Sequence, residues 1–482
     1  MADVTAPQQP SLSPLPQPLP NAMPQPMDQR WQEHWQQRWY PVAYLEELDR
    51  RRPRAFTLLG TDLVLWWEPA SGRWRAFADV CPHRLVPLSE GRVNERGELE
   101  CPYHGWSFAG DGACTTIPQA TAEQAASACA SPRSHCRGFA TAEAQGLLFV
   151  FAGEAGRAGA VTLPLVPPLD EPGWLVQGTF RDLPMDALTL LENVLDVSHV
   201  PFTHHRTVGR RDNAAPVEAE LLSQGPEGFT ALWAEGPRQG RLGSQHTTFM
   251  APGLMWHDLT ARGFGRILTV VYATPIRPGE CRLFARFPFQ FNSALPRLLV
   301  GLRPRWLQHL GNHTVLDDDQ VFLHWQERAL ASRGGSAAYD RACFLPTGAD
   351  LYGRQLHRWV REVGGVPFPG QPLPPRQLSE PLLERWHAHT RHCRACSAAL
   401  TGIRRWRPAL LAAMAITLLL FVVVPQPGAR AGLVALLMIG GLLLRQLAQW
   451  ERRLLQGDGQ APRNRLPRLG PWTGKGGRAA EW

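Results

Sequence analysis

Two short segments that each contain one cysteine and one histidine constrain this chain more than any other feature. Residues 81–85 read CPHRL and residues 101–106 read CPYHGW, with a polar, Gly-punctuated connector between them. Two cysteines and two histidines could bind one tetrahedral zinc ion, but zinc sites usually keep like ligands together, with C-x-x-C spacing. Each pair here mixes one Cys with one His. Chance clustering of Cys and His in loops is the alternative that predicts no metal.

Two hairpin tips that each present a thiolate and an imidazole suit a Rieske 2Fe-2S cluster, in which two thiolates bind one iron and two imidazoles bind the other. The Pro after each Cys and the Gly after His104 favour tight turns that hold the ligands inward. We therefore predict a 2Fe-2S cluster bound by Cys81, His83, Cys101 and His104. The nine cysteines form no regular pattern, which indicates a reducing compartment rather than a disulfide scaffold.

The fold class predicted by the sequence is α+β. Short apolar runs such as LVLWW and LLFVF alternate with turn residues between residue 31 and about residue 156, which is typical of a small antiparallel β domain. Residues 160 to about 390 mix strand-like runs with helical candidates around 186–199 and 306–331. Residues 1–27 are rich in Pro and Gln and lack positive charge, so we expect a disordered extension rather than a secretory signal or transit peptide.

Together with the iron-site motif, the C-x-x-C pair and the C-terminal apolar runs described below, these patterns predict six regions along the chain. They are a disordered extension (1–27), an antiparallel β Rieske domain (28–156), an α+β mononuclear-iron catalytic domain (157–390), a linker with a C-x-x-C pair (391–407), two transmembrane helices (408–450) and a basic tail (451–482).

A Rieske cluster alone only transfers electrons, so the remainder of the chain decides the class of protein. About 380 residues follow Cys101, too many for a ferredoxin, and neither loop has the second Cys of a cytochrome-complex Rieske domain. Residues 192–205 read ENVLDVSHVPFTHH. Because Pro201 disfavours helix at Val200, we expect a helix that carries Asn193, Asp196 and His199 to end there.

The chain then turns, so we expect His204 to lie close to His199. Two imidazoles and a distant carboxylate form the facial triad of non-haem Fe(II) oxygenases, which leaves positions open for O2 and substrate. His205 is an alternative to His204, and both could instead be surface or core histidines, since the chain has 16.

The two Cys/His pairs together with NVLDVSHVPFTH resemble Rieske-type oxygenases. The longer strings CPHRLVPLSEGRV, YHGWSF and GACTTIPQA resemble one family within that class, the pheophorbide a oxygenase family, which includes chlorophyllide a oxygenase and the plastid translocon-associated Rieske protein. The resemblance implies that His199 and His204 bind the mononuclear iron and that Asp196 bridges the two metal centres. It further implies ferredoxin as electron donor, O2 and a chlorophyll-derived tetrapyrrole as substrates, and a homotrimer in which His104 of one subunit contacts Asp196 of the next.

The third iron ligand in this class is an Asp that begins D-x-x-x-x-E-x-Q on a helix. The segment HTVLDDDQVFLHWQER offers Asp319, with His324 at the Glu position and Gln326 at the Gln position. We predict Asp319 as the ligand, with Asp318 as the alternative. Asp317 to Asp319 could also simply begin a helix, where acidic side chains suit the positive end of the dipole.

Cys393 and Cys396 form a C-x-x-C pair whose Arg and His neighbours should lower a thiol pKa. A single pair is a weak zinc signal, and the pair could also be two unpaired thiols near a membrane. Similarity to the family implies a regulatory redox pair that thioredoxin reduces.

Two apolar runs, 408–424 and 431–444, predict a transmembrane hairpin, and a buried helical hairpin is the alternative. Arginines gather before the first run and after the second, whereas the turn has only Arg430, so both flanks should face the cytoplasm or stroma. This placement explains much of the net charge of +8 and favours a membrane, not nucleic acid, as the partner.

The sequence thus predicts a membrane-anchored Rieske oxygenase of a cyanobacterial or plastid membrane, and the family resemblance implies pheophorbide a as leading substrate. Methyl oxidation of the chlorophyllide a oxygenase type and a redox sensor or electron carrier without oxygenase activity are the alternatives.

Overall fold

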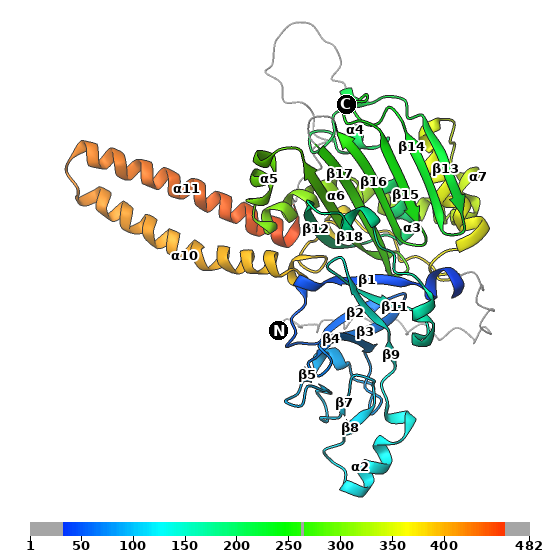
Figure 1. The fold of residues 1–482 in the computed structure, drawn as a ribbon. Coiled ribbons are helices and arrows are strands. Elements are labelled where there is room, and N and C mark those ends of the chain that lie inside the picture. Colours follow the sequence, from blue (N-terminus) through cyan, green and yellow to red (C-terminus); the bar gives the residue numbers. More distant parts are fainter. Residues whose placement is uncertain (1–31, 262–264, 458–482) are drawn as a thin grey trace, which may run out of the picture.

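The structure is a computed structural model that describes residues 32–261 and 265–457. The predicted extension over 1–27 and most of the predicted basic tail lie outside these residues. Figure 1 shows a body made of a smaller N-terminal β part and a larger part built on one broad sheet, with a long helical hairpin projecting from the side. This arrangement confirms the α+β fold.

The N-terminal part consists of three small antiparallel sheets, with strand orders β1-β11-β10, β2-β3-β4-β9 and β5-β6-β7-β8. Their strands are β1 (Trp39–Tyr44), β2 (Arg54–Leu58), β3 (Thr61–Glu68), β4 (Arg73–Ala78), β5 (Arg92–Val93), β6 (Leu99–Glu100), β7 (Ser107–Phe108), β8 (Cys114–Thr116), β9 (Gly138–Phe139), β10 (Thr141–Ala144) and β11 (Leu147–Phe151). A helix, α2 (Ala122–Cys129), follows β8. The predicted antiparallel β domain is confirmed.

The larger part is built on a seven-stranded antiparallel sheet with strand order β12-β18-β17-β16-β15-β14-β13. Its strands are β12 (Leu175–Leu183), β13 (Ala219–Gly225), β14 (Gly228–Trp233), β15 (Gln245–Met250), β16 (Leu254–Ala261), β17 (Gly265–Arg277) and β18 (Glu280–Phe291). The helices of this part are α3 (Ala187–Leu195), α4 (Val200–Thr203), α5 (Ala294–Gly301), α6 (Arg305–Ala331), α7 (Tyr339–Ala342), α8 (Leu351–Trp359) and α9 (Ser379–Leu382). Helices α3, α6 and α8 contact one another or the sheet, and the candidate site lies between α3, α4 and α6.

One hydrophobic core runs from the β2-β3-β4-β9 sheet into the larger part. Phe56, Leu63 and Trp74 from the small sheet belong to the same buried cluster as Leu191 on α3 and Leu323 on α6. The contact between β2 and β17 lies in this region. Because the packing is continuous, the β part is fixed against the larger sheet.

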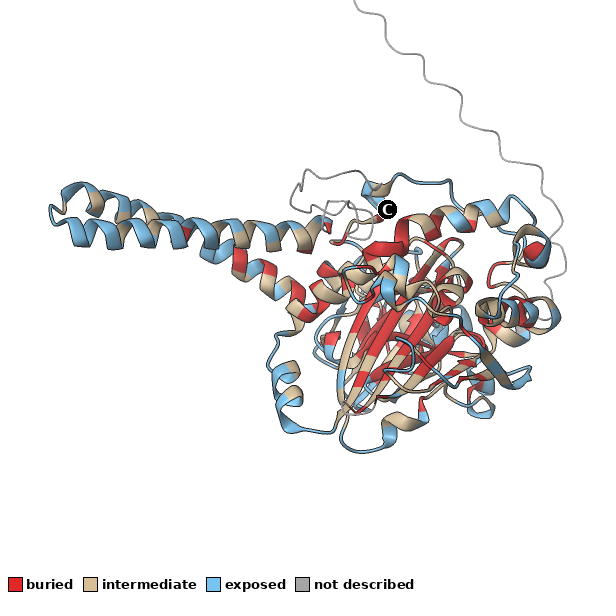
Figure 2. Ribbon diagram, turned by 90° about the horizontal axis from the view of Figure 1, so that it is seen from above, coloured by how far each residue is buried: buried red, intermediate tan, exposed pale blue. Residues whose placement is uncertain are grey.

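The C-terminal hairpin is formed by α10 (Arg394–Val423) and α11 (Pro427–Gln456), each 30 residues long. A helix of that length extends about 45 Å, more than the hydrocarbon core of a bilayer, about 30 Å. Both helices are long and apolar enough to be candidate membrane spans, and almost none of their apolar windows is buried. Figure 2 shows the exposed colouring along most of the hairpin. A hairpin buried in the protein, the alternative considered above, is therefore wrong.

The base of the hairpin is held by charged and aromatic contacts. Glu451 on α11 pairs with Arg404 and Arg407 on α10 at 2.9 and 3.0 Å. Trp450 packs edge-on against Trp306 of α6 at a ring-centroid distance of 5.1 Å. Most of the residues expected to form a linker, 391–407, instead belong to α10.

The helix expected around 186–199 ends earlier than predicted. Helix α3 stops at Leu195, Asp196 is extended, and a separate short helix, α4, begins at Val200. Pro201 does not end a helix, because it occupies the first turn of α4, where a missing N–H costs no helical hydrogen bond. The break gives Asp196 and His199 backbone directions that one continuous helix would not allow.

Candidate metal centres and substrate cavity

The two Cys/His loops have the same backbone closure although their Cys-to-His spacings differ. The Cys81 carbonyl accepts from the Leu85 N–H at 2.9 Å, and the Cys101 carbonyl accepts from the Gly105 N–H at 3.1 Å. Leu85 and Gly105, each four residues after its Cys, have positive φ angles of 60° and 70°. Each tip is therefore a five-residue turn closed in the left-handed region, which favours Gly and strains Leu.

The side chains of these loops form a compact, inward-facing group. Cys81 and Cys101 are 0% and 2% exposed within an apolar cluster, and burial raises the pKa of Cys81 to about 11. The His83 and His104 rings lie 4.7 Å apart, and His83 stacks on Trp106 at 4.6 Å.

Both imidazoles keep one nitrogen available on the inner side. The Nδ1 atoms of His83 and His104 are buried and have no hydrogen-bond partner within the part of the chain that the structure describes. A buried ring nitrogen without a partner is costly, and a metal bond at each Nδ1 would satisfy it. The donor set of two thiols and two orphaned imidazole nitrogens fits a Rieske cluster.

A second group of ligating side chains lies between α3, α4 and α6. One atom each from His199, His204 and Asp319 lies within 4.8 Å of the other two. His199 Nε2 faces His204 Nε2 at 3.2 Å, and Asp319 Oδ2 lies 3.7 Å from His204 Nε2. The structure thus brings together all three residues predicted as iron ligands.

Hydrogen bonds on the outer nitrogens fix the direction of both rings. His199 Nδ1–H donates to the carbonyl of Asp196 at 2.6 Å, and His204 Nδ1–H donates to Asp318 Oδ2 at 3.3 Å. If both rings are neutral, the inner Nε2 atoms direct two lone pairs at each other across 3.2 Å, an arrangement that a cation between them makes favourable. Metal-binding histidines usually have this kind of outer partner.

The three consecutive aspartates have three different surroundings. They lie in the middle of α6 and are buried, so the idea that they simply begin a helix is wrong. Asp319 faces the two histidines and accepts a hydrogen bond from Asn193, Asp318 contacts His204 and Thr207, and Asp317 binds two arginines. Burial raises the pKa of Asp319, against the opposing effect of the nearby histidines. The geometry favours Asp319 over Asp318 as a ligand.

Asp196 lies beside the iron-site group but does not point its carboxylate into it. Its Oδ1 accepts from the Ser198 N–H and hydroxyl at 2.7 and 2.6 Å, and its side chain is 36% exposed. Burial would raise the pKa of Asp196, but hydrogen bonds from His199 and Ser198 lower it overall. His205, the alternative to His204, accepts from the Arg211 N–H at 3.3 Å and lies outside the three-residue group.

Departures from the expected helix motif are explained by local contacts. His324, at the Glu position, donates from Nδ1 to the Pro184 carbonyl at 2.6 Å and accepts from the Gln377 N–H at 3.0 Å. Gln326 donates to Glu192 on α3 at 3.3 Å. Both side chains therefore join α6 to neighbouring segments.

A cavity of about 700 Å³ opens beside the iron-site group. His199, His204 and Asp319 form part of its wall, which is otherwise mainly apolar and includes Val197, Phe202, Leu242, Val271, Phe287 and Leu316. Arg210 and Arg238 also line the cavity, and both are exposed. Such a volume and lining suit a large, mostly apolar small molecule with an anionic group.

Sequence reasoning missed two residues that the structure brings to the C-x-x-C pair. His309 of α6 and His389 join Cys393 and Cys396 in one buried group of four. The sequence signal was weak, because His309 is separated from Cys393 by 84 positions.

Comparison with known proteins agrees with this architecture. Residues 38–131 match the model of the Rieske [2Fe-2S] domain, and residues 249–337 match the model of the pheophorbide a oxygenase family. The fold is similar to that of NdmB from Pseudomonas putida CBB5, with a TM-score of 0.55, 23% identity, and coverage of 68% of this chain and 90% of that one. The two matched family models define the class: an O2-dependent oxygenase with a Rieske [2Fe-2S] domain, in which His199, His204 and Asp319 offer the donors for a further metal ion.

The particular family follows from the curated relatives. The chain is 38% identical to the chloroplastic pheophorbide a oxygenase of Arabidopsis thaliana, over 76% of this chain and 72% of the relative. It is also 38% identical to the corresponding protein of Oryza sativa subsp. japonica, with 76% and 73% covered. The chain therefore belongs to the pheophorbide a oxygenase family.

Proposed function

We propose that Cys81, His83, Cys101 and His104 hold the 2Fe-2S cluster and that His199, His204 and Asp319 hold the mononuclear iron. The orphaned inner nitrogens of the first group and the opposed lone pairs of the second support these assignments. When bound, the cluster supplies single electrons and the iron supplies the chemistry of O2. The protein's own residues set the ring directions and hold the Asp319 carboxylate in place.

The proposed reaction is oxygenation of a chlorophyll-derived tetrapyrrole, with pheophorbide a as substrate and a ring-opened linear product. The observation that carries this proposal is the apolar cavity of about 700 Å³ whose wall includes the three proposed iron ligands. Pheophorbide a is a broad apolar macrocycle with one free carboxylate. Its ring would occupy the apolar part of the cavity, and Arg210 or Arg238 could pair with the carboxylate.

Asp196 is proposed to bridge the two metal centres between subunits of a homotrimer. Figure 1 shows the β5–β8 sheet and α4 at opposite ends of the molecule, so a cluster and an iron in one chain would be far apart. His104 is partly exposed although its Nδ1 is buried, so its outer nitrogen can be reached by a neighbouring chain. The carboxylate of Asp196, 36% exposed, offers an acceptor for that imidazole N–H.

The hairpin is proposed to anchor the enzyme in a cyanobacterial or plastid membrane, with the catalytic part on the cytoplasmic or stromal side. Helix α5 supports this placement, because its Leu295, Leu298 and Leu299 and the adjoining Leu302 are all exposed at helical spacing. Trp306, just after α5, contacts Trp450 at the base of the hairpin. Leucines and tryptophans at this level suit the boundary of a bilayer. The membrane would also concentrate an apolar pigment.

Product analysis tests the proposed function. Purified full-length protein, reduced ferredoxin and O2 are incubated separately with pheophorbide a, chlorophyllide a and protochlorophyllide a. Ring-opened product from pheophorbide a supports the proposal. Formyl product from chlorophyllide a would instead support methyl oxidation, and absence of mononuclear iron and of every product would indicate an electron carrier.

A further inference from the structure

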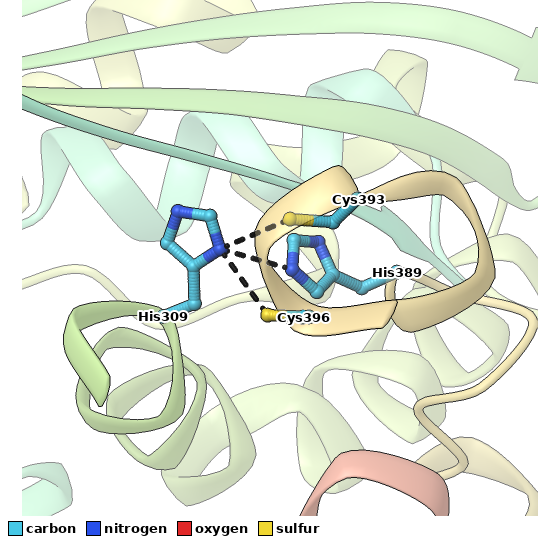
Figure 3. A group of neighbouring side chains, drawn as sticks. All are labelled: His309, His389, Cys393 and Cys396. Carbon is cyan, nitrogen blue, oxygen red and sulfur yellow. Dashed lines mark hydrogen bonds between the residues drawn. The ribbon is translucent and has the colours of Figure 1, made fainter. Parts of the chain in front are cut away.

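A third group of metal-ligating side chains lies at the base of the hairpin, separate from the two centres described above. It consists of His309 on α6, His389 in the turn before α10, and Cys393 and Cys396 at the start of α10. None of the four is more than 1% exposed. Figure 3 shows both sulfurs and the His389 ring facing the Nδ1 atom of His309.

The spacing of the four donor atoms matches one tetrahedral ion. His309 Nδ1 lies 3.4 Å from each sulfur and 3.2 Å from His389 Nε2, and all four atoms lie within 4.8 Å of one another. A tetrahedron with Zn–S about 2.3 Å and Zn–N about 2.0–2.1 Å has edges of about 3.3–3.8 Å. Only small shifts would bring the atoms to bonding positions.

The tautomers of the two histidines leave both inner nitrogens without a proton. His309 Nε2–H donates to the Gly178 carbonyl at 3.0 Å, and His389 Nδ1–H donates to the Phe180 carbonyl at 2.7 Å. A carbonyl can only accept, so each ring directs a lone pair at the other across 3.2 Å. This is the same arrangement as at His199 and His204, and a bound cation removes the repulsion.

We propose that His309, His389, Cys393 and Cys396 bind one structural Zn²⁺ ion. Two thiolates and two imidazoles in a tetrahedral arrangement are a typical zinc donor set, and four protein ligands leave no position open for catalysis. The burial of all four residues also suits a closed structural site.

The same burial argues against a thioredoxin-regulated disulfide. Exchange requires an incoming thiolate to approach a sulfur directly, yet Cys393 and Cys396 are 0% and 1% exposed. Glu47 covers Cys393, with its Oε1 3.5 Å from the sulfur and its Oε2 accepting from the Arg394 N–H at 2.5 Å. A partner protein could reach the pair only after the base of the hairpin had opened.

The zinc ion would fasten the hairpin to the catalytic part. Its ligands come from α6, from the turn before α10 and from the start of α10, and the outer N–H groups of the two histidines bind carbonyls of β12. Arg385 and Thr390 in the same turn donate to carbonyls of Arg453 and Leu454 on α11. The ion would therefore sit where both hairpin helices meet the helix that carries Asp319.

The experiment uses the full chain purified in detergent without added chelator. Elemental analysis should give about one zinc per chain in addition to the iron. X-ray absorption at the zinc edge should show about two sulfur ligands at about 2.3 Å and two nitrogen ligands at about 2.0–2.1 Å. This measurement on the wild type needs no variant and does not depend on activity.

The variant Cys393→Ser/Cys396→Ser should lose the zinc while the visible spectrum of the 2Fe-2S cluster is unchanged. Cys343→Ser, a thiol just after α7, is the matched control and should keep the zinc. Zinc retained in the double variant would overturn the proposal. So would iron in place of zinc, or a zinc-free wild type whose Cys393 and Cys396 form a disulfide by mass spectrometry.

Discussion

Replacing Asp317, Asp318 and Asp319 one at a time by Asn should produce three different defects. The three positions are adjacent on α6 and all are buried, so a general effect of lost charge would be similar at each. Their partners differ: two arginines, one histidine with a threonine, and the proposed iron position. Comparing the three variants therefore distinguishes a metal ligand, a residue that orients a metal ligand, and a residue that pairs with two buried arginines.

The expected magnitudes follow from those partners. Asp319→Asn removes a proposed anionic ligand, so the mononuclear iron should be lost. Asp318→Asn weakens the group that orients His204, and outer partners of this kind typically change metal affinity by 10–100-fold, about 1.4–2.7 kcal/mol. Asp317→Asn leaves Arg181 and Arg385, 0% and 1% exposed, without their common counter-charge and should lower stability by about 3–5 kcal/mol.

The assay measures iron against acid-labile sulfide, which serves as an internal count of the cluster. The wild type and Asp317→Asn should give about three irons per two sulfides, and Asp319→Asn about two. Asp318→Asn should reach three only at a 10–100-fold higher Fe(II) concentration. Thermal unfolding should show the largest loss for Asp317→Asn. If Asp318→Asn loses the iron while Asp319→Asn keeps it, the assignment of the third ligand is wrong.

Three further predictions address the bridge, the cluster and a buried carboxyl pair. Asp196→Asn should keep both metals but slow reoxidation of the reduced cluster in a single turnover with substrate and O2; fast reoxidation coupled to product would refute the bridging role. His104→Cys should retain some cluster with a potential lower by hundreds of millivolts, because a thiolate replaces a neutral imidazole, and an unchanged potential in redox titration would contradict the assignment. Burial raises the pKa of Asp186 to about 6 and that of Glu327 to about 7, above the values of the unfolded chain. The contribution of this carboxyl pair to the free energy of unfolding is therefore greatest below about pH 4 and is lost as pH rises toward 7. Glu327→Gln should therefore raise the melting temperature relative to the wild type more at pH 8 than at pH 5, and an equal difference at both values would show that Glu327 does not titrate in this range.

The proposed cluster ligands could be predicted from sequence because the two ligands of each loop are close neighbours along the chain. Five residues set each turn, and the mixed Cys/His pairs narrow the chemistry before any long-range contact is known. The core strands and α6 were likewise visible in local apolar patterns. Recognition of the His199 and His204 spacing needed the family motif, since histidines alone do not indicate a metal.

Other features depended on contacts that the sequence does not display. The end of α3 was misplaced because Pro201 is compatible both with ending one helix and with beginning the next. The roles of Asp317, Asp318 and Asp319 depend on which side of α6 meets which neighbour. The histidine partners of the C-x-x-C pair were missed because His309 lies 80 positions before His389 and reaches it only through packing of α6 against the turn before α10.

The continuous core between the β2-β3-β4-β9 sheet and the larger sheet means that the iron–sulfur part is not a detachable module. A fragment ending near residue 156 would expose Phe56, Leu63 and Trp74, whose burial is completed by helices and strands of the catalytic part. Such a fragment would leave these apolar side chains in contact with water and would tend to associate. The cluster-binding loops therefore cannot swing on a tether toward an electron acceptor, because the fold itself fixes their position relative to the larger sheet.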